Sequence, residues 1–129
     1  MAIANLPQIA LLSSIGFKYD YSASENERMN NIYNFALNNF KKKIQLEEIA
    51  AVADLVPNSF CRYFKAHTNK TYIEFLNEVK IGQACKLLIK QMNPSQVCFE
   101  IGFNNFTHFN NQFKKITGIT PKQYQQKYA

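Results

Sequence analysis

The most constraining feature of this sequence is an internal repeat with an offset of 49 residues. Ile101 lies 49 positions after Val52, and Phe109 lies the same distance after Phe60. The same offset relates further pairs in order: Ala53 with Gly102, Phe64-Lys65 with Phe113-Lys114, Thr68 with Thr117, Thr71 with Thr120, and Phe75 with Tyr124. Each copy is expected to hold a short helix, a tight turn and a longer helix, which is the geometry of a helix-turn-helix.

Apolar periodicity and capping residues predict an all-α fold of seven helices, with no strand-like alternation. Ser24 and Glu27 form a capping box for the first helix, which is expected to end near Phe40. The remaining helices are expected over residues 46–53, from Pro57 onward, over 72–90 behind the cap Thr71, from Pro94 to near Gly102, after Asn104 or Asn105, and from Thr120-Pro121 through Tyr128.

The helical spacing also predicts which side chains face the interior. The two longer helices of the repeat are expected to bury aromatic rings, namely Phe60, Tyr63 and Phe64 in the first copy and Phe106, Phe109 and Phe113 in the second. The long helix between the copies carries its own apolar positions, namely Ile73, Leu76, Val79, Ala84, Leu87 and Leu88.

The expected organisation is a lead-in or interdomain linker at residues 1–23, followed by one double helix-turn-helix domain at 24–129. Within that domain the first unit covers about 24–70, the linker helix about 72–90 and the second unit about 94–128. A linker helix of 19 residues is about 28 Å long at about 1.5 Å per residue. One turn of B-DNA is about 34 Å, so this connector is suited to placing two helices in successive major grooves.

The charge distribution favours a polyanionic partner. The net charge is +6, but residues 1–40 carry two basic and three acidic side chains and residues 41–129 carry thirteen and six. The basic body therefore indicates a nucleic acid. Lys41, Lys42 and Lys43 either complement the dipole of the helix that precedes them or contact phosphate.

Other classes of function find little support in the composition. Cys61, Cys85 and Cys98 form no CxxC pair, which is typical of reduced intracellular thiols. His67 and His108 are isolated, so no metal and no cofactor is expected. Glycine-rich phosphate loops, nucleophile elbows and membrane-spanning apolar runs are absent, so we expect neither an enzyme nor a membrane protein.

The side chains that face outward on the second helix of each copy are the candidate DNA contacts. In the first copy they are Asn58, Ser59, Cys61, Arg62 and Lys65. In the second copy they are Asn105, Thr107, His108, Asn110, Asn111 and Lys114. Arginine suits guanine and asparagine suits adenine, so the asparagine-rich second copy favours A·T-containing half-sites. Each residue is also an ordinary polar surface residue, and it is their equivalent placement in a repeat that favours the functional interpretation.

Residues 44–128 resemble the DNA-binding domain of AraC/XylS-type bacterial transcription regulators. The matching stretches are LEEIA at 46–50, FCRYFK at 60–65, IGF at 101–103 and, most specifically, FNNQFKKITGITPKQY at 109–124. The resemblance implies seven helices, two helix-turn-helix units joined by a linker helix, and sequence-specific promoter binding. It further implies a cytoplasmic regulator, usually an activator that touches RNA polymerase.

The resemblance also carries individual contacts over to this chain. The family's base-contacting face matches Asn58, Cys61 and Arg62 in the first unit and Phe106, Thr107, Asn110 and Asn111 in the second. Cys61 and Asn111 stand where a longer polar side chain and an arginine are common, so the base preference does not transfer. Phe106 either stacks on a thymine methyl or staples the turn.

Members of this family usually carry a sensing domain, for which this chain is too short. We therefore expect either a fragment of a longer regulator or a stand-alone regulator controlled by its own abundance. The main alternative from another class is a helical module that binds a protein or an RNA without reading duplex sequence. A minor alternative makes Cys61 a redox-sensitive thiol at the start of a helix.

Overall fold

The computed structural model describes residues 23–129, and within this range every regular element is an α-helix. The helices are α2 (Ala23–Asn39), α3 (Leu46–Val52), α4 (Pro57–Thr68), α5 (Tyr72–Ile89), α6 (Pro94–Glu100), α7 (Phe106–Thr117) and α8 (Pro121–Tyr128). The expected all-α fold with two helix-turn-helix units and a linker helix is confirmed. The lead-in expected at residues 1–23 lies almost entirely outside the described residues.

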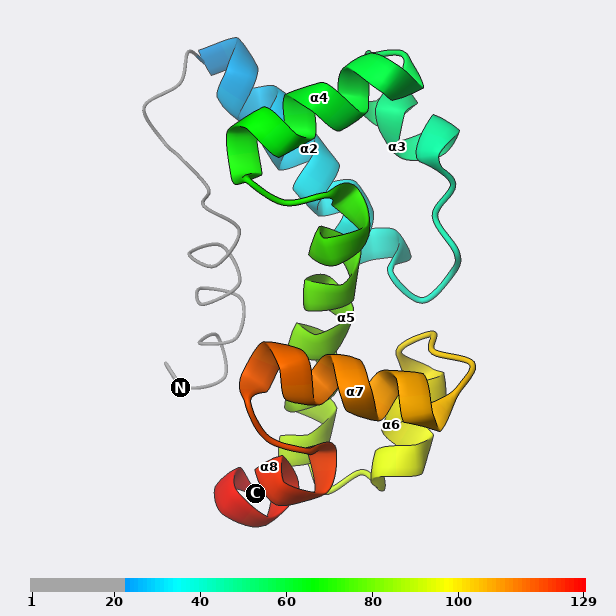
Figure 1. Ribbon diagram of the computed structural model, residues 1–129, viewed down its shortest axis with the longest axis vertical. Helices are drawn as coiled ribbons and strands as arrows, with labels where there is room; N and C mark the ends of the chain where they lie inside the picture. The colour runs from blue at the N-terminus through cyan, green and yellow to red at the C-terminus, as the bar shows by residue number, and fades with distance from the viewer. Residues whose placement is uncertain (1–22) are drawn as a thin grey trace.

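Two helical bodies share α5 as their common helix. Figure 1 shows α2, α3 and α4 around the beginning of α5, and α6, α7 and α8 around its end. Phe75 and Val79 of α5 belong to the core of the first body, whereas Ala84 and Leu88 belong to the core of the second. The helix therefore presents apolar side chains to two different neighbours along its length, which explains why so many of its positions are apolar.

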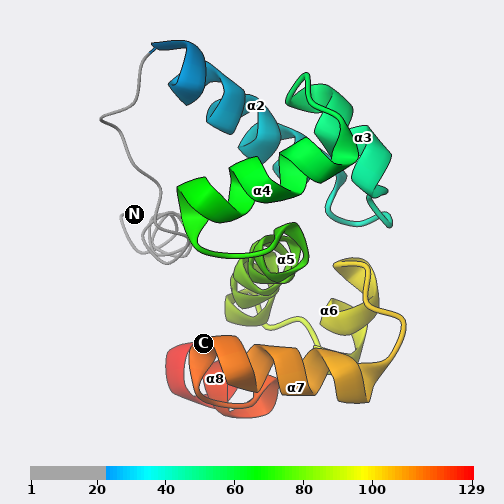
Figure 2. The same cartoon turned by 45° about the horizontal axis from the view of Figure 1, so that its top comes forward.

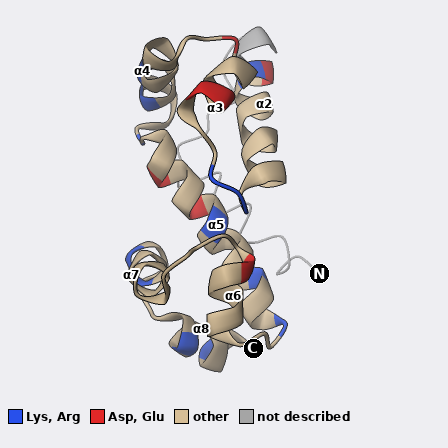
Figure 3. Ribbon diagram, turned by 90° about the vertical axis from the view of Figure 1, so that its right-hand side faces the viewer, with Lys and Arg blue, Asp and Glu red and all other residues tan. Residues whose placement is uncertain are grey.

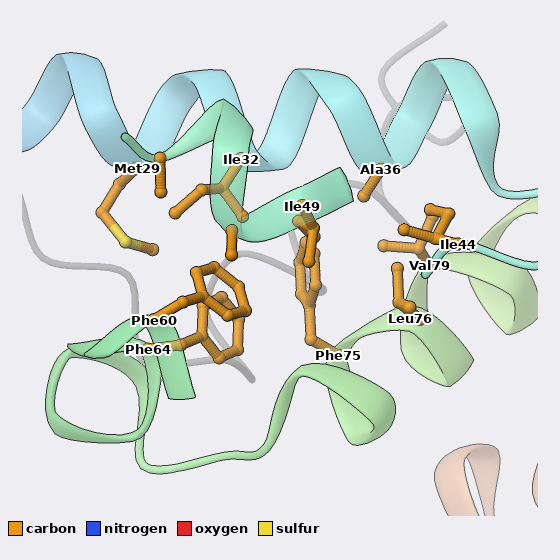
Figure 4. Packing of buried hydrophobic residues seen from close by; sticks show 12 residues of the cluster. Met29, Ile32, Ala36, Ile44, Ile49, Phe60, Phe64, Phe75, Leu76 and Val79 are labelled. Carbon is orange, nitrogen blue, oxygen red and sulfur yellow. The ribbon is translucent and has the colours of Figure 1, made fainter. Parts of the chain in front are cut away.

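The first body has an aromatic core. Phe60 and Phe64 of α4 are fully buried and lie near Phe75 of α5, with 5.2 Å between the ring centroids of Phe64 and Phe75. Figure 4 shows these rings facing Ile32 of α2 and Ile49 of α3. Burial of a phenylalanine or isoleucine side chain contributes about 1.5–3 kcal/mol, so this cluster holds the four helices together.

The helix starts follow from local capping chemistry. Thr71 accepts a hydrogen bond at Oγ1 from the Glu74 amide (3.2 Å) and donates its own amide to Glu74 Oε1 (2.9 Å). Thr120 makes the same pair of bonds with Gln123 at 3.2 and 3.0 Å. The two threonine caps expected from the sequence are confirmed, and Asn105 rather than Asn104 caps α7.

At the first helix the sequence-based expectation needs two corrections. The helix begins at Ala23, so Ser24 is already helical, and its side chain lies outside the description. α2 ends at Asn39 with no basic residue in its last turn, so Lys41 to Lys43 stand beyond the helix rather than at its dipole. The helix dipole therefore acts on this triplet only weakly, because the effect falls off within the last turn.

The register of the repeat also needs a correction. In each turn an amide bonds back to a carbonyl five residues earlier, from Leu55 to Ala50 in the first and from Phe103 to Cys98 in the second, both at 3.0 Å. The offset between these bonds is 48 residues, not 49. The pairings of Val52 with Ile101 and of Ala53 with Gly102 are therefore wrong. Asn104 is an additional residue in the second turn, and the offset of 49 holds only from the recognition helix onward.

Two apolar side chains that were expected to face the interior are exposed. Ile73 is 50% exposed and Phe106 is 40% exposed. Both stand in the first turn of their helices, before the chain reaches the packed face. The predicted inward positions Phe60, Phe64, Phe109 and Phe113 are confirmed as fully buried.

Candidate nucleic-acid interface

The two recognition helices of the repeat, α4 and α7, project on the same side of the molecule. Figure 1 and Figure 2 show both helices lying across α5 in a similar direction. Figure 3 shows them nearly end-on, both on one side of α5. A single surface therefore presents the outward positions of both repeat copies.

The local sequence of α4 explains how it is held. Val56 is its N-cap residue and Pro57 occupies the first turn, where a missing amide donor costs nothing. Phe60 and Phe64 face the core and leave the opposite side of the helix free. At the other end Thr68 Oγ1 donates to the Phe64 carbonyl (2.8 Å), and the chain reverses at Asn69.

Most of the predicted first-unit contacts lie on the free side of α4. Asn58, Cys61, Arg62 and Lys65 are exposed, whereas Ser59 is half-buried. Lys65 Nζ lies 3.4 Å from the Asn69 carbonyl and can swing away from it to a phosphate. Arg62 carries a guanidinium that suits guanine O6 and N7, and it forms no ion pair with any other described residue.

α7 presents the second set, and its first turn is shaped by Asn105. The Asn105 Oδ1 accepts a hydrogen bond from the His108 amide (2.9 Å), so the cap occupies part of the hydrogen-bonding capacity of this predicted contact. Thr107, His108, Asn111 and Lys114 are exposed, whereas Asn110 is half-buried.

Phe106 stands at the start of α7 with both of its predicted roles intact. Its ring lies edge-on to the buried Phe109 ring, with 5.8 Å between centroids. At the same time 40% of the residue is exposed on the recognition side. The ring therefore staples the turn, and its outer edge is free for apolar contact with a base.

The cysteines separate into one exposed and two buried thiols. Cys61 is exposed on α4, and Cys85 and Cys98 lie in the core of the second body. Burial raises the pKa of the Cys85 thiol to about 11, so it stays protonated and unreactive at neutral pH. No group of histidine, cysteine and acidic side chains among the described residues is arranged to hold a metal ion.

A cleft between the two bodies was not predicted from the sequence. It has a volume of about 960 Å³ and runs beside α5, between the segment that follows α2 and the second turn. Ile73, Asn77 and Lys80 of α5 line it at helical spacing, and Thr107 and His108 bring the start of α7 to its edge. These three residues share one face of α5 at i, i+4 and i+7. The sequence shows that spacing, but the apolar positions of this helix were used only to predict its buried face, so the two polar residues were not noticed.

The two bodies meet at the base of this cleft. Gly102 has a φ of +95°, and a Cβ there would lie 2.5 Å from the Lys41 carbonyl oxygen. Lys41 Nζ also lies 3.5 Å from Glu100 Oε1, and Phe40 packs against the cores of both bodies. The segment after α2 therefore braces the second turn and sets where α7 stands relative to α4.

No helix among the described residues meets the length and apolarity needed to cross a membrane.

Comparison with known proteins gives consistent results. A family model described as a helix-turn-helix domain matches residues 49–127. The chain is 32% identical over 113 residues to the uncharacterized regulator YdeC of Bacillus subtilis, covering 84% of this chain and 39% of YdeC. It is 34% identical over 113 residues to an uncharacterized HTH-type transcriptional regulator of Pseudoalteromonas carrageenovora, covering 84% of this chain and 68% of the relative.

Solved structures show the same fold. An AraC-type regulator from Chromobacterium violaceum superposes with a TM-score of 0.76 at 18% identity, covering 84% of this chain and 97% of the other. The DNA-binding domain of AdpA, solved in complex with a target DNA, gives 0.70 at 22% identity, with coverages of 78% and 92%.

The matches support the predicted class of protein. The matched domain is a non-enzymatic DNA-binding module, in agreement with the expectation from the sequence. The chain spans about two fifths of YdeC and about two thirds of the Pseudoalteromonas relative. On the match to 49–127 and the relatives that share it, this chain belongs to the AraC-type helix-turn-helix family of transcription regulators.

Proposed function

We propose that this chain reads one asymmetric duplex site as a single molecule, with α4 and α7 in successive major grooves. The observation that carries the proposal is the placement of both helices on one side of a shared linker helix. α5 has 18 residues, hence a length of about 27 Å, which is comparable with the turn of about 34 Å that separates successive grooves. The AdpA domain has the same fold and was solved with its target DNA.

The outward side chains suggest how the two half-sites differ. Arg62 of α4 is assigned to a guanine, and Asn58 and Cys61 lie beside it within the same groove. Asn110 and Asn111 of α7 are assigned to adenines, because an asparagine amide pairs with N6 and N7 of that base. The first unit is thus expected to read a half-site that contains G·C, and the second a half-site rich in A·T.

The wider setting follows from the family. We propose that the chain acts in the cytoplasm as a promoter-binding regulator, that it activates transcription by touching RNA polymerase, and that a sensing domain accompanies it in the full regulator. The relative from Mannheimia succiniciproducens named as the activator RhaS is 30% identical over 87 residues, which supports the activator role.

The experiment is selection of duplexes by the purified chain from fragmented bacterial genomic DNA, followed by titration of a selected site and its scrambled version. We expect the selected site to bind at least roughly tenfold more tightly, well within the usual range for specific recognition. Equal affinity for both duplexes at moderate salt would contradict sequence-specific reading and would favour the helical module that binds protein or RNA.

A further inference from the structure

The cleft between the two bodies carries charge that the base-reading helices do not use. Its walls hold Lys41, Lys42, Lys43 and Lys80, with Glu47 as the one acidic side chain among its lining residues. Figure 3 shows the blue segment after α2 beside the blue stretch of α5. A basic cleft of about 960 Å³ is a site for an anion rather than for an apolar molecule.

The four lysines are not equivalent. Lys41 pairs with Glu100 at 3.5 Å and Lys42 pairs with Glu48 at 3.0 Å, so two of the charges are already balanced at the rim. Lys80 forms no ion pair with any other residue of the described range, and its Nζ lies 5.1 Å from the centroid of the Phe103 ring. A half-buried ammonium that rests on a ring face is stabilised further when an anion approaches it.

Burial has already altered the chemistry of this lysine. The removal of water from the half-buried ammonium lowers the pKa of Lys80 below its ordinary value. The charged form is therefore held at some cost in the free protein, and a neighbouring anion would recover that cost. The Phe103 ring also restricts where the ammonium can point, which preorganises it toward the cleft.

Hydrogen-bond donors reach the cleft from both walls. Asn77 stands on α5 one turn before Lys80, and His108 and Asn111 stand on α7 across from it. His108 and Asn111 also belong to the outward face of the recognition helix. The cleft is therefore continuous with the surface proposed to enter the second major groove.

We infer that this cleft receives a phosphate of the DNA backbone between the two half-sites, with Lys80 as its cation and Asn77 and His108 as its donors. The inference rests on the proposed function, because a duplex of either sequence that lies along α4 and α7 carries its sugar-phosphate backbone past the cleft. Such a contact is independent of base sequence and fixes the position of the duplex on the protein. It adds affinity equally to specific and to scrambled DNA.

The test compares the parent chain with Lys80→Gln and with Lys127→Gln as the matched control. Lys127 also stacks a cation on a ring, 5.4 Å from the Tyr128 centroid. It lies in α8, and neither Lys127 nor any other residue of α8 lines the cleft. Both substitutions remove one charge and one ring contact, but only Lys80 lines the cleft.

The readout is the dependence of duplex affinity on salt concentration. Each phosphate contact contributes about 0.9 to the slope of log affinity against log salt, so Lys80→Gln should reduce the slope by about 1. It should weaken selected and scrambled duplexes by the same factor, roughly three- to tenfold. Lys127→Gln should change neither quantity. An unchanged slope for Lys80→Gln would overturn the inference.

A second measurement uses the unmodified chain and does not depend on how a variant folds. Lysines are acylated with an amine reagent in the presence and absence of a selected duplex, and each site is quantified by mass spectrometry. The duplex should protect Lys80 and leave Lys127 as reactive as before. Equal labelling of Lys80 in both samples would overturn the inference.

A third arm separates DNA phosphate from a free anion. Inorganic phosphate is titrated into the protein while the side-chain NMR signals of Asn77 and His108 are followed. We expect weak, non-saturating shifts with phosphate and full shifts with duplex. Saturable phosphate binding together with an unchanged salt slope would assign the cleft to a free anion instead. A parent chain that binds no duplex specifically would contradict the proposed function itself, which keeps the two failures distinct.

Discussion

The two helix-turn-helix units end their recognition helices in the same way and begin them differently. Thr68 and Thr117 each donate from Oγ1 to the carbonyl four residues earlier, both at 2.8 Å. The residue after each threonine, Asn69 or Gly118, then turns with positive φ. Both copies therefore end the recognition helix with the same local hydrogen bond and the same kind of turn.

The beginnings differ, and the second turn packs against the segment that follows α2. The first turn closes at Asp54 with a φ of 60°, and α4 starts from Val56 without a side-chain cap. The second closes at Gly102 against the Lys41 carbonyl, and one additional residue precedes the cap Asn105. The second unit therefore starts its recognition helix from a turn that packs against the first body, and the Lys41 backbone of the first body provides the surface for that contact.

The first prediction tests whether the two cores contribute equally to the free energy of unfolding. Phe64→Ala and Phe113→Ala should each reduce the free energy of unfolding by about 3–5 kcal/mol, because each removes a fully buried ring and leaves a cavity. Urea denaturation followed by far-ultraviolet circular dichroism measures both. A variant as stable as the parent would place that ring outside its core.

The second prediction concerns the contact between Gly102 and the Lys41 backbone. Gly102→Ala should destabilise the chain by about 1–3 kcal/mol beyond Gly118→Ala, because its Cβ would be forced into a packed contact. Both glycines have positive φ, but a Cβ at Gly118 meets no atom within 4 Å, whereas at Gly102 it would meet the Lys41 backbone. Gly118→Ala is therefore the control for backbone conformation alone. Equal thermal melting temperatures for the two variants would contradict a close contact between the bodies.

The third prediction separates the reading face from the core. Arg62→Ala should weaken binding to the selected duplex by about 1–3 kcal/mol and relax base preference at one position. Its circular dichroism spectrum should match that of the parent, because the side chain is exposed. Unaltered binding would show that the first recognition helix is oriented differently. Asn111→Ala makes the corresponding test in the second unit.

The fourth and smallest prediction uses the chemistry of the two threonine caps. The Thr71 backbone amide holds the pKa of Glu74 below its ordinary value of 4.5, whereas the equivalent Gln123 does not titrate. The unfolded chain therefore binds this proton first as the pH falls. The stabilisation is full above the ordinary value and is lost as the pH falls through the folded pKa.

Glu74→Gln gives the first cap the side chain of the second. We expect its thermal melting temperature to fall less between neutral pH and about pH 3 than that of the parent. The opposite change, Gln123→Glu, should add acid sensitivity to the second unit. Identical pH dependence in all three proteins would show that the carboxylate cap contributes nothing measurable.

The helices were predictable from the sequence because their starts depend on local chemistry. Thr71, Thr120 and Pro57 satisfy or avoid unpaired amides whatever surrounds them, so their helices begin where expected. The recognition faces followed from the same logic, since Phe60 and Phe109 must be buried and the opposite positions then face outward.

The features that were missed depend on how the two bodies meet. The additional Asn104, the brace between Gly102 and Lys41, and the cleft beside Lys80 all arise from contacts between segments distant in sequence. No local sequence pattern distinguishes a lysine that extends from a helix into solvent from one that, like Lys80, lies over a ring such as that of Phe103. Ile73 was expected in the core for a similar reason. Helical spacing alone does not show that no neighbouring helix covers the first turn of α5 at this position.

The most direct test of the central claim is an interference footprint on a selected duplex at known stoichiometry. Base modifications in the major groove are scored for loss of binding, and the mass of the complex gives the number of chains bound. We expect one chain per duplex and two patches of interference on the same face, separated by about 10 base pairs. One patch, or two chains bound per site, would contradict a bipartite reader built on α5.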